Sequence, residues 1–196
     1  MKIIGVTGLM GSGKSTVCNM LVDLGAKKID ADEVGHSIYL PGTPGYKAVI
    51  DAFGNGITDL AGVIDRKKLG NIVFEDESKR LLLNKITHPL IEQAIRTQLK
   101  EYKEQGVEVV ALEAALLIEA GYTKMVDEVW LTVAPLEVMI ERLHKSRGMD
   151  KNDVMRRIRT QLSINELRHE ADNVITTTNP IPSVAERVRY LYNHLK

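Results

Sequence analysis

Short apolar stretches of strand length recur along the chain and alternate with longer amphipathic segments. Most of these stretches are nearly continuous in Val, Ile and Leu, which is typical of parallel strands covered by helices on both faces. They predict five strands, at residues 3–7, 27–29, 107–112, 128–133 and 173–176. Because strands that alternate with helical segments favour βαβ units, we expect an α/β domain with a five-stranded parallel sheet.

The segments between these stretches carry apolar residues at the three- and four-residue spacing of helices. The spacing predicts helices near residues 17–24, 91–102, 136–143 and 184–195. Gly25 and Gly106 follow the first two helices at the position of a C-terminal cap, and Pro135 precedes the third. Pro89 favours a helix start, because a proline in the first turn gives up no helical hydrogen bond. We interpret each apolar stripe as core packing.

The stretch between the second and third predicted strands is too long for a simple crossover. It runs from Asp30 to Gly106 and holds the turn-rich sequence Pro41-Gly42-Thr43-Pro44-Gly45, which short helical patterns follow. We therefore expect a single domain with a core at about 1–40, 106–143 and 168–196. A helical insertion at about 41–105 is expected to handle a second substrate.

Residues 8–16 read GLMGSGKST and match the Walker A pattern, with a predicted strand before them and a helix after. Glycines in this pattern let backbone N–H groups converge on phosphate oxygens at the positive end of the helix. We expect Lys14 to reach the β- and γ-phosphates, Ser15 to ligate Mg²⁺ and Thr16 to support the α-phosphate. The predicted nucleotide-binding residues of the loop are Gly8, Gly11, Ser12, Gly13, Lys14, Ser15 and Thr16.

The loop alone does not specify what receives the phosphate. A small-molecule kinase and a nucleotide-dependent switch protein both fit it. A guanine-reading switch would carry an Asn-Lys-x-Asp segment late in the chain, and the sequence has none. A kinase predicts an acidic pair after the second strand and a basic segment near the fourth, and both are present.

The acidic pair is Asp30 and Asp32, at the C-terminal end of the second predicted strand. Open α/β sheets bind ligands at this edge, where carboxylates can orient a hydroxyl, accept its proton or hold Mg²⁺ through water. If the strand continues, residues two apart point to opposite faces and only one would meet the nucleotide. Asp32 could alternatively, or in addition, cap a helix that begins at Glu33.

The basic segment covers residues 142–159 and contains seven basic and two acidic residues. Arginines aimed at a transferring phosphoryl group stabilise its charge and can exclude water on closure. We expect a short lid at about 144–167, in which at least half of these cations are solvated surface charges. Arg142 is the predicted nucleotide-side contact, and Arg147 and Arg157 come next.

In their order and spacing, these motifs resemble the dephospho-coenzyme A kinase family over nearly the whole chain. Besides the loop, the resemblance rests on Ile29-Asp30-Ala31-Asp32, Pro41-Gly42, Ile64-Asp65-Arg66 with Leu69, Ile86-Thr87-His88-Pro89-Leu90-Ile91, Leu116-Leu117, Arg142-Leu143, Arg157-Ile158 and Ala171-Asp172 with Val174-Ile175. It implies a three-layer P-loop kinase fold with a helical acceptor insertion and a short lid. The implied reaction is Mg²⁺-dependent transfer of the ATP γ-phosphate to the ribose 3′-hydroxyl of dephospho-coenzyme A, the last step of coenzyme A biosynthesis.

By position, Asp32 resembles the proposed base of that family, and Lys14 and Arg142 complete the implied catalytic set. The resemblance also implies that the insertion covers the acceptor, with Asp30, Asp32, Arg66, His88, Leu116 and Glu119 as acceptor-binding residues. From the residues alone, a buried or capping histidine is the favoured interpretation of His88, and Arg66 is a solvated surface charge; with the resemblance, the two interpretations of His88 are about equally favoured. A nucleoside monophosphate kinase is the near alternative, and a switch protein is the distant one.

Three departures from the family pattern leave individual roles open. Glu113-Ala114-Ala115-Leu116-Leu117 replaces Asp-x-Pro-Leu-Leu, so a role for Glu113 toward Mg²⁺ or the acceptor is open. Ser146 stands where an arginine is common. The sequence Thr176-Thr177-Thr178-Asn179 replaces Asp-Asn, which leaves the adenine-side contacts open.

The amino-acid composition limits the kinds of partner that the protein is expected to bind. Lys plus Arg and Asp plus Glu number 26 each, and this balance argues against a dedicated nucleic-acid binder. No apolar run approaches the ~18 residues of a membrane span, and the apolar stretch near the N-terminus is too short for a signal peptide. Cys18 is the only cysteine, which excludes an intramolecular disulfide. We expect a cytoplasmic monomer or small homo-oligomer that binds ATP and dephospho-coenzyme A but neither nucleic acid nor membrane.

Overall fold

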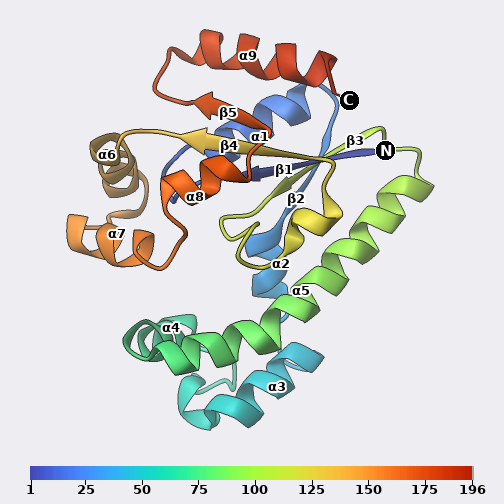
Figure 1. Ribbon diagram of the computed structural model, residues 1–196. Helices are drawn as coiled ribbons and strands as arrows, with labels where there is room; N and C mark the ends of the chain where they lie inside the picture. Colours follow the sequence, from blue (N-terminus) through green and yellow to red (C-terminus); the bar gives the residue numbers. More distant parts are fainter. Residues whose placement is uncertain (196) are drawn as a thin grey trace. The chain divides into compact units, whose positions relative to one another are not determined.

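Five parallel strands form one sheet in the order β2-β3-β1-β4-β5 in the computed structural model, which describes residues 1–195 (Figure 1). Their bounds are β1 (Lys2–Thr7), β2 (Lys27–Asp30), β3 (Val109–Glu113), β4 (Glu128–Val133) and β5 (Asn173–Thr176). The sheet and its five predicted strands are thus confirmed, with ends within two residues of those expected. The central strand β1 pairs with both β3 and β4, so that Ile4 lies opposite Ala111 and Glu128.

The strands belong to the first of two compact units, which comprises residues 1–30 and 99–196. Its helices are α1 (Lys14–Asp23), the 3₁₀ helix η2 (Tyr122–Met125), α6 (Leu136–Arg147), α7 (Lys151–Ile158), α8 (Ile164–His169) and α9 (Ile181–Asn193). The helices predicted near 17–24, 136–143 and 184–195 are confirmed. Gly25 has the positive φ of +105° that suits its place just after α1.

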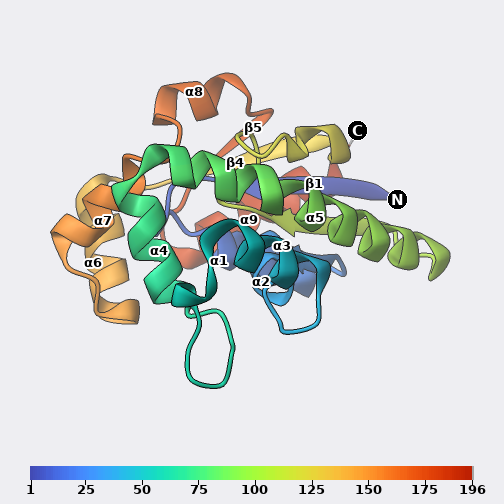
Figure 2. The same ribbon diagram turned by 90° about the horizontal axis from the view of Figure 1, so that it is seen from below.

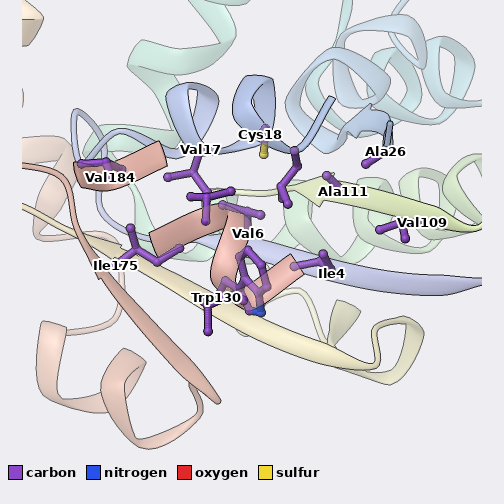
Figure 3. Close-up of a cluster of buried hydrophobic side chains, with 13 residues drawn as sticks. Ile4, Val6, Val17, Cys18, Ala26, Val109, Ala111, Trp130, Ile175 and Val184 are labelled. Atoms are coloured by element: carbon purple, nitrogen blue, oxygen red, sulfur yellow. The ribbon is translucent and has the colours of Figure 1, made fainter. Parts of the chain in front are cut away.

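The core of this unit lies where α1 and α9 pack on the sheet (Figure 3). Side chains such as Val17, Trp130 and Val188 are fully buried there, each from a different element. Removal of this apolar surface from water is the main driving force for packing the helices on the strands. Burial, followed by the charge of Glu113, raises the pKa of the Cys18 thiol in the same cluster.

The second unit comprises residues 31–98 and overlaps the predicted insertion. It contains α2 (Ala31–Ser37), α3 (Pro44–Phe53), the 3₁₀ helix η1 (Asn55–Ile57), α4 (Arg66–Glu75) and most of α5 (Glu77–Glu104). A small core of its own, centred on Val49, Ile57, Ile64 and Leu69, holds α3, η1, α4 and α5 together. Figure 2 shows the loop between η1 and α4 reaching away from the helices.

Two predicted helix starts are wrong. The helix expected to begin at Pro89 begins at Glu77, and Pro89 lies inside it. Asp76 explains the earlier start, because its carboxylate accepts hydrogen bonds from the N–H groups of Ser78 and Lys79, as an N-cap does. The helix expected at Glu33 begins at Ala31, directly after β2, so Asp32 lies in the first turn of α2 and is not its cap.

Among residues 1–195, no helix is both long enough and apolar enough to span a membrane.

Candidate active site

The loop between β1 and α1 depends on glycines for its shape. Gly8, Gly11 and Gly13 have φ angles of 144°, 78° and 97°, which residues other than glycine rarely adopt. A Cβ atom on Gly8 would lie 2.5 Å from the carbonyl oxygen of Thr132, so the chain also passes too close for a side chain. The Ser12 hydroxyl, which is buried, shares a 2.7 Å hydrogen bond with the Thr132 hydroxyl and fixes the loop to β4.

Lys14 lies within this loop and is 9% exposed. Its ammonium donates hydrogen bonds to the carbonyl oxygens of Gly8, at 3.0 Å, and Leu9, at 3.3 Å. These two neutral acceptors hold the charge at the centre of the loop. The next residue, Ser15, and then Thr16 follow in the first turn of α1, where both are exposed.

A buried carboxylate connects the loop to the neighbouring strands. Glu113, at the end of β3, accepts a 2.6 Å hydrogen bond from the Ser15 hydroxyl through Oε1. Its Oε2 lies 2.6 Å from the ammonium of Lys28, which is also 3.5 Å from Asp30. Burial by itself lowers the pKa of Lys28, but the hydrogen bond and charge of Glu113 outweigh it and raise that pKa above its usual value. Glu113, whose role the sequence left open, thus touches the predicted metal ligand directly.

Arg142 reaches the same loop from α6. One guanidinium nitrogen donates to the carbonyl of Gly11 at 3.3 Å and to the hydroxyl of Thr177 at 3.0 Å. The other donates to the carbonyl of Thr177 at 2.7 Å. Arg147 lies exposed in the last turn of α6 and Ser146 bonds back to the Arg142 carbonyl, so within this helix Arg142 is the arginine held at the loop.

The segment between α7 and α8 also contacts the loop. The side chain of Gln161 accepts a 3.2 Å hydrogen bond from the N–H of Met10 and donates a 3.1 Å bond to the carbonyl of Ala115. The next residue, Leu162, donates its N–H to Glu119 at 3.0 Å. One oxygen of Glu119, a predicted acceptor contact, is therefore engaged within this unit. Leu116 is half-buried beside Ala115.

The remaining predicted site residues lie in the second unit. Arg66 is exposed at the start of α4, where Asp65 caps the helix by accepting from two backbone N–H groups. Burial raises the pKa of Tyr39. A hydrogen bond with Thr87 and the positive charge of Arg66 partly oppose this rise. His88 follows Thr87 in α5, and burial lowers its pKa. Asp32 is exposed on α2.

Sequence reasoning missed several hydrogen-bonding side chains that connect the loop to distant segments, Thr177 and Gln161 among them. A run of three threonines at the end of a predicted strand was visible, but it did not show which one is buried. Gln161 carries no motif that spacing could reveal, because its partners are a backbone N–H and a backbone carbonyl far away in sequence.

Comparison with known proteins agrees with this arrangement. The family model described as dephospho-CoA kinase matches residues 2–183. A dephospho-CoA kinase from Dehalococcoides mccartyi is 48% identical over 175 residues, which cover 89% of this chain and 88% of that protein.

Two solved structures extend the comparison. A Thermus thermophilus protein, 27% identical, superposes with a TM-score of 0.84 over 100% of this chain and 98% of its own. A dephospho-CoA kinase from Campylobacter jejuni, 25% identical, gives a TM-score of 0.71 with the same coverage. The α/β P-loop kinase fold expected from the sequence is thus confirmed, and the chain belongs to the dephospho-CoA kinase family.

Proposed function

We propose that this protein transfers the γ-phosphate of ATP to the ribose 3′-hydroxyl of dephospho-coenzyme A and so forms coenzyme A. Membership of the dephospho-CoA kinase family over residues 2–183 carries the choice of acceptor. The single structural observation that supports a transferase is the convergence of Lys14, Ser15 and Arg142 on one glycine-shaped loop.

On the nucleotide side, the loop supplies backbone N–H groups and the N-terminus of α1, both of which attract phosphate oxygens. Lys14 and Arg142 bring two positive charges, and both donate hydrogen bonds to neutral oxygen atoms of the protein. We expect both to exchange these oxygens for phosphate oxygens when ATP binds. Phosphoryl transfer places little covalent work on the protein, so positioning and charge stabilisation by these two groups account for most of the catalysis.

On the metal side, the residues present fit Mg²⁺. The Ser15 hydroxyl and a Glu113 carboxylate oxygen lie 2.6 Å apart and are the hard oxygen donors that this ion prefers. Within residues 1–195 there is no cluster of three or more His, Cys, Asp or Glu side chains that could hold a metal. Mg²⁺ needs no such cluster, because it is usually bound by one or two protein groups together with substrate phosphates and water. When bound, it would neutralise charge that develops on the β- and γ-phosphates.

On the acceptor side, we assign Asp32 as the base that accepts the proton of the attacking hydroxyl, with Asp30 next to it in sequence. A carboxylate at hydrogen-bond distance can take that proton and orient the oxygen for attack. Arg66 and His88, together with Leu116 and Glu119, are assigned to binding of dephospho-coenzyme A. The exposed guanidinium of Arg66 suits a phosphate of that substrate, because arginine binds phosphate oxygens through two parallel hydrogen bonds.

The test is ADP release from ATP with a panel of acceptors at equal concentration. The panel contains dephospho-coenzyme A, AMP, CMP, UMP, GMP and shikimate, with a no-acceptor reaction as the blank. We expect turnover on dephospho-coenzyme A to exceed that on every other compound by at least about 10³-fold, because a site that hydrogen-bonds its substrate strongly rejects an analogue that leaves the polar groups of the site unpaired. Equal turnover on a nucleoside monophosphate would contradict the acceptor assignment.

Lys14→Met serves as the control for contaminating kinases. It removes the ammonium that neutralises phosphate charge and preserves most of the apolar stem of the side chain. Activity that survives in this variant does not come from the loop. Acceptor-independent GTP binding without turnover would instead indicate a nucleotide switch.

A further inference from the structure

Thr177 is a buried threonine at the turn that follows β5, between two exposed threonines. It is 5% exposed, whereas Thr176 and Thr178 are open to solvent. Its backbone N–H donates to the carbonyl of Val133 at 3.0 Å, which ties the turn to the end of β4. The side chain is therefore held in place by the sheet and does not depend on a flexible loop.

The hydroxyl of Thr177 joins the phosphate loop to Arg142. It donates to the carbonyl of Ser12 at 2.7 Å, with the carbonyl of Val133 as a second, longer acceptor at 3.3 Å, and accepts from the guanidinium of Arg142 at 3.0 Å. A hydroxyl has one donor and two acceptor positions, so both bonds can exist at once. The carbonyl of Thr177 accepts the second guanidinium nitrogen at 2.7 Å. Thr177 therefore forms two hydrogen bonds with Arg142 and one with the phosphate loop.

The methyl group of Thr177 also touches the loop. A Cβ atom built on Gly13 would lie 3.0 Å from Cγ2 of Thr177, which shows how closely the side chain approaches the last glycine before Lys14. Serine would keep the hydroxyl bonds but lose this contact. Valine would keep the volume but lose both hydroxyl bonds. The two functions of the side chain can therefore be separated by substitution.

The guanidinium of Arg142 is held in position by neutral groups, which do not cancel its positive charge. Its hydrogen-bond partners are the carbonyls of Gly11 and Thr177 and the Thr177 hydroxyl, and within residues 1–195 it forms no ion pair with a carboxylate. A neighbouring carboxylate would hold the guanidinium equally well but would cancel its charge. Neutral acceptors instead leave the full positive charge at a half-buried position, where an anion gains most from it.

We infer that Thr177 is a positioning residue for phosphoryl transfer: it holds the phosphate loop and the guanidinium of Arg142 in one fixed arrangement. Groups that are already oriented before the reaction stabilise developing charge without any cost of reorganisation. The role that we assign to the hydroxyl is indirect, through its hydrogen bonds to Arg142 and to the carbonyl of Ser12. This inference rests on the proposed function for its activity readout.

The test compares Thr177→Val, Thr177→Ser and the matched control Thr178→Val, which makes the same change at the exposed neighbour. We expect Thr177→Val to lower kcat by about 10-fold to 100-fold, since a misplacement of about 1 Å can cost about 100-fold. Thr177→Ser should stay within about 3-fold of the wild type because it keeps both hydroxyl bonds. Thr178→Val should match the wild type. Equal kcat for Thr177→Val and Thr178→Val overturns the inference.

A double-mutant cycle with Arg142→Lys separates positioning from a merely structural role. If Thr177 acts through Arg142, adding Thr177→Val to Arg142→Lys should lower kcat much less than Thr177→Val does alone. This would be contradicted if the kcat reductions of the two single variants simply multiplied in the double variant. It would also be contradicted if Thr177→Val lost thermal stability but its folded fraction kept the wild-type kcat. Should Thr177→Val not fold, Thr177→Ala carries the same prediction, since it also removes the hydroxyl.

ADP affinity, measured by calorimetry, keeps this inference distinct from the proposed function. If the wild type does not phosphorylate dephospho-coenzyme A, the proposed acceptor is wrong. The role of Thr177 is then judged by ADP binding, which Thr177→Val should weaken by about 5-fold or more relative to Thr178→Val, since a lost hydrogen bond typically corresponds to a factor of about 5 in affinity. Unchanged ADP affinity in that case overturns the inference as well.

Discussion

Glu113 gives the clearest example of a single residue with two partners. The residue is 5% exposed, and its carboxylate contacts the Ser15 hydroxyl on one side and the Lys28 ammonium on the other. Removing one member of a buried ion pair leaves the other charge without compensation, which is usually more damaging than never having had the pair. The position of Ser15 is therefore linked to the charge balance between β2 and β3.

We predict that Glu113→Gln weakens the response of the enzyme to Mg²⁺. Glutamine keeps the shape but offers a neutral oxygen to Ser15 and removes the closer of the two carboxylates beside Lys28. The Mg²⁺ concentration for half-maximal activity should rise by about 10-fold, as residues that orient a metal ligand typically contribute 10-fold to 100-fold. Glu108→Gln, a change just before the same strand, is the control. An unchanged Mg²⁺ requirement would separate Glu113 from the metal.

A second prediction concerns Asp32, which we assign as the base. Asp32→Asn removes the proton acceptor and should lower kcat by about 10²-fold while leaving ADP affinity unchanged. Asp23→Asn, an exposed aspartate at the end of α1, is the matched control and should behave as the wild type. Wild-type turnover in Asp32→Asn would reduce Asp32 to an exposed carboxylate in the first turn of α2.

Among single residues, those that belong to a recognisable sequence motif could be predicted. Lys14 and Ser15 belong to a pattern whose spacing already defines their roles, and both lie in the expected loop. Thr177 could not be singled out, because its partners are a backbone carbonyl and a guanidinium more than 30 residues away in sequence. Burial distinguishes it from its two threonine neighbours, and burial follows from the fold.

The turn between β1 and α1 is the element that brings the cations together. Gly8 combines a φ of 144° with a close backbone oxygen, which would lie 2.5 Å from a Cβ atom at this position. A backbone oxygen cannot move aside as a flexible side chain can. The turn therefore requires glycine for two independent reasons, conformational and steric.

We predict that Gly8→Ala costs more stability than Gly106→Ala. Gly106 also has a positive φ, +75°, but a Cβ atom there would meet open space. The conformational penalty alone is about 1–2 kcal/mol for a residue other than glycine. Gly8→Ala should add a steric cost and should also reduce ADP binding, whereas Gly106→Ala should leave ADP binding intact. Thermal unfolding and calorimetry check both parts. Equal stability and ADP affinity in the two variants would contradict the steric argument.

Helix α5 shows where local sequence signals compete. Pro89 lacks an N–H group and favours a helix start, which is why the sequence predicted one there. The cap supplied by Asp76 begins the helix earlier, and apolar packing on both sides of the proline, by the partly buried Ile86 and the fully buried Ile95, favours its continuation. Packing therefore overrode a local preference.

The same helix carries a pH-dependent group, His88. Burial lowers its pKa, so the unfolded chain binds the proton more tightly than the folded chain does. The stability from this group is complete above the ordinary histidine pKa of about 6.5 and is lost as the pH falls through that value toward the folded pKa.

We predict that the melting temperature of the wild type falls between pH 7.5 and pH 5.5 and that His88→Asn shows a smaller fall. His169→Asn, which changes a histidine whose side chain is 88% exposed, should follow the wild type. Parallel curves for all three proteins would show that protonation of His88 does not weaken the folded state.

For the whole molecule, the sequence predicted a parallel five-stranded α/β fold because the strands are short, apolar and separated by helical stripes. The strand order β2-β3-β1-β4-β5 could not be predicted, since pairing depends on contacts between segments distant in the chain. The long stretch after β2 indicated an extra helical element, and residues 31–98 do form a unit with its own core. Its assignment to acceptor binding stays a prediction.

The central claim is that the phosphate leaves ATP and arrives on one hydroxyl of dephospho-coenzyme A. The most direct measurement is ³¹P NMR of a complete reaction containing the wild-type protein, Mg²⁺, ATP and dephospho-coenzyme A. We predict one new phosphomonoester resonance that matches the 3′-phosphate of authentic coenzyme A, equal in amount to the ADP formed. ADP with inorganic phosphate only, or a phosphoester at any other hydroxyl, would contradict the account.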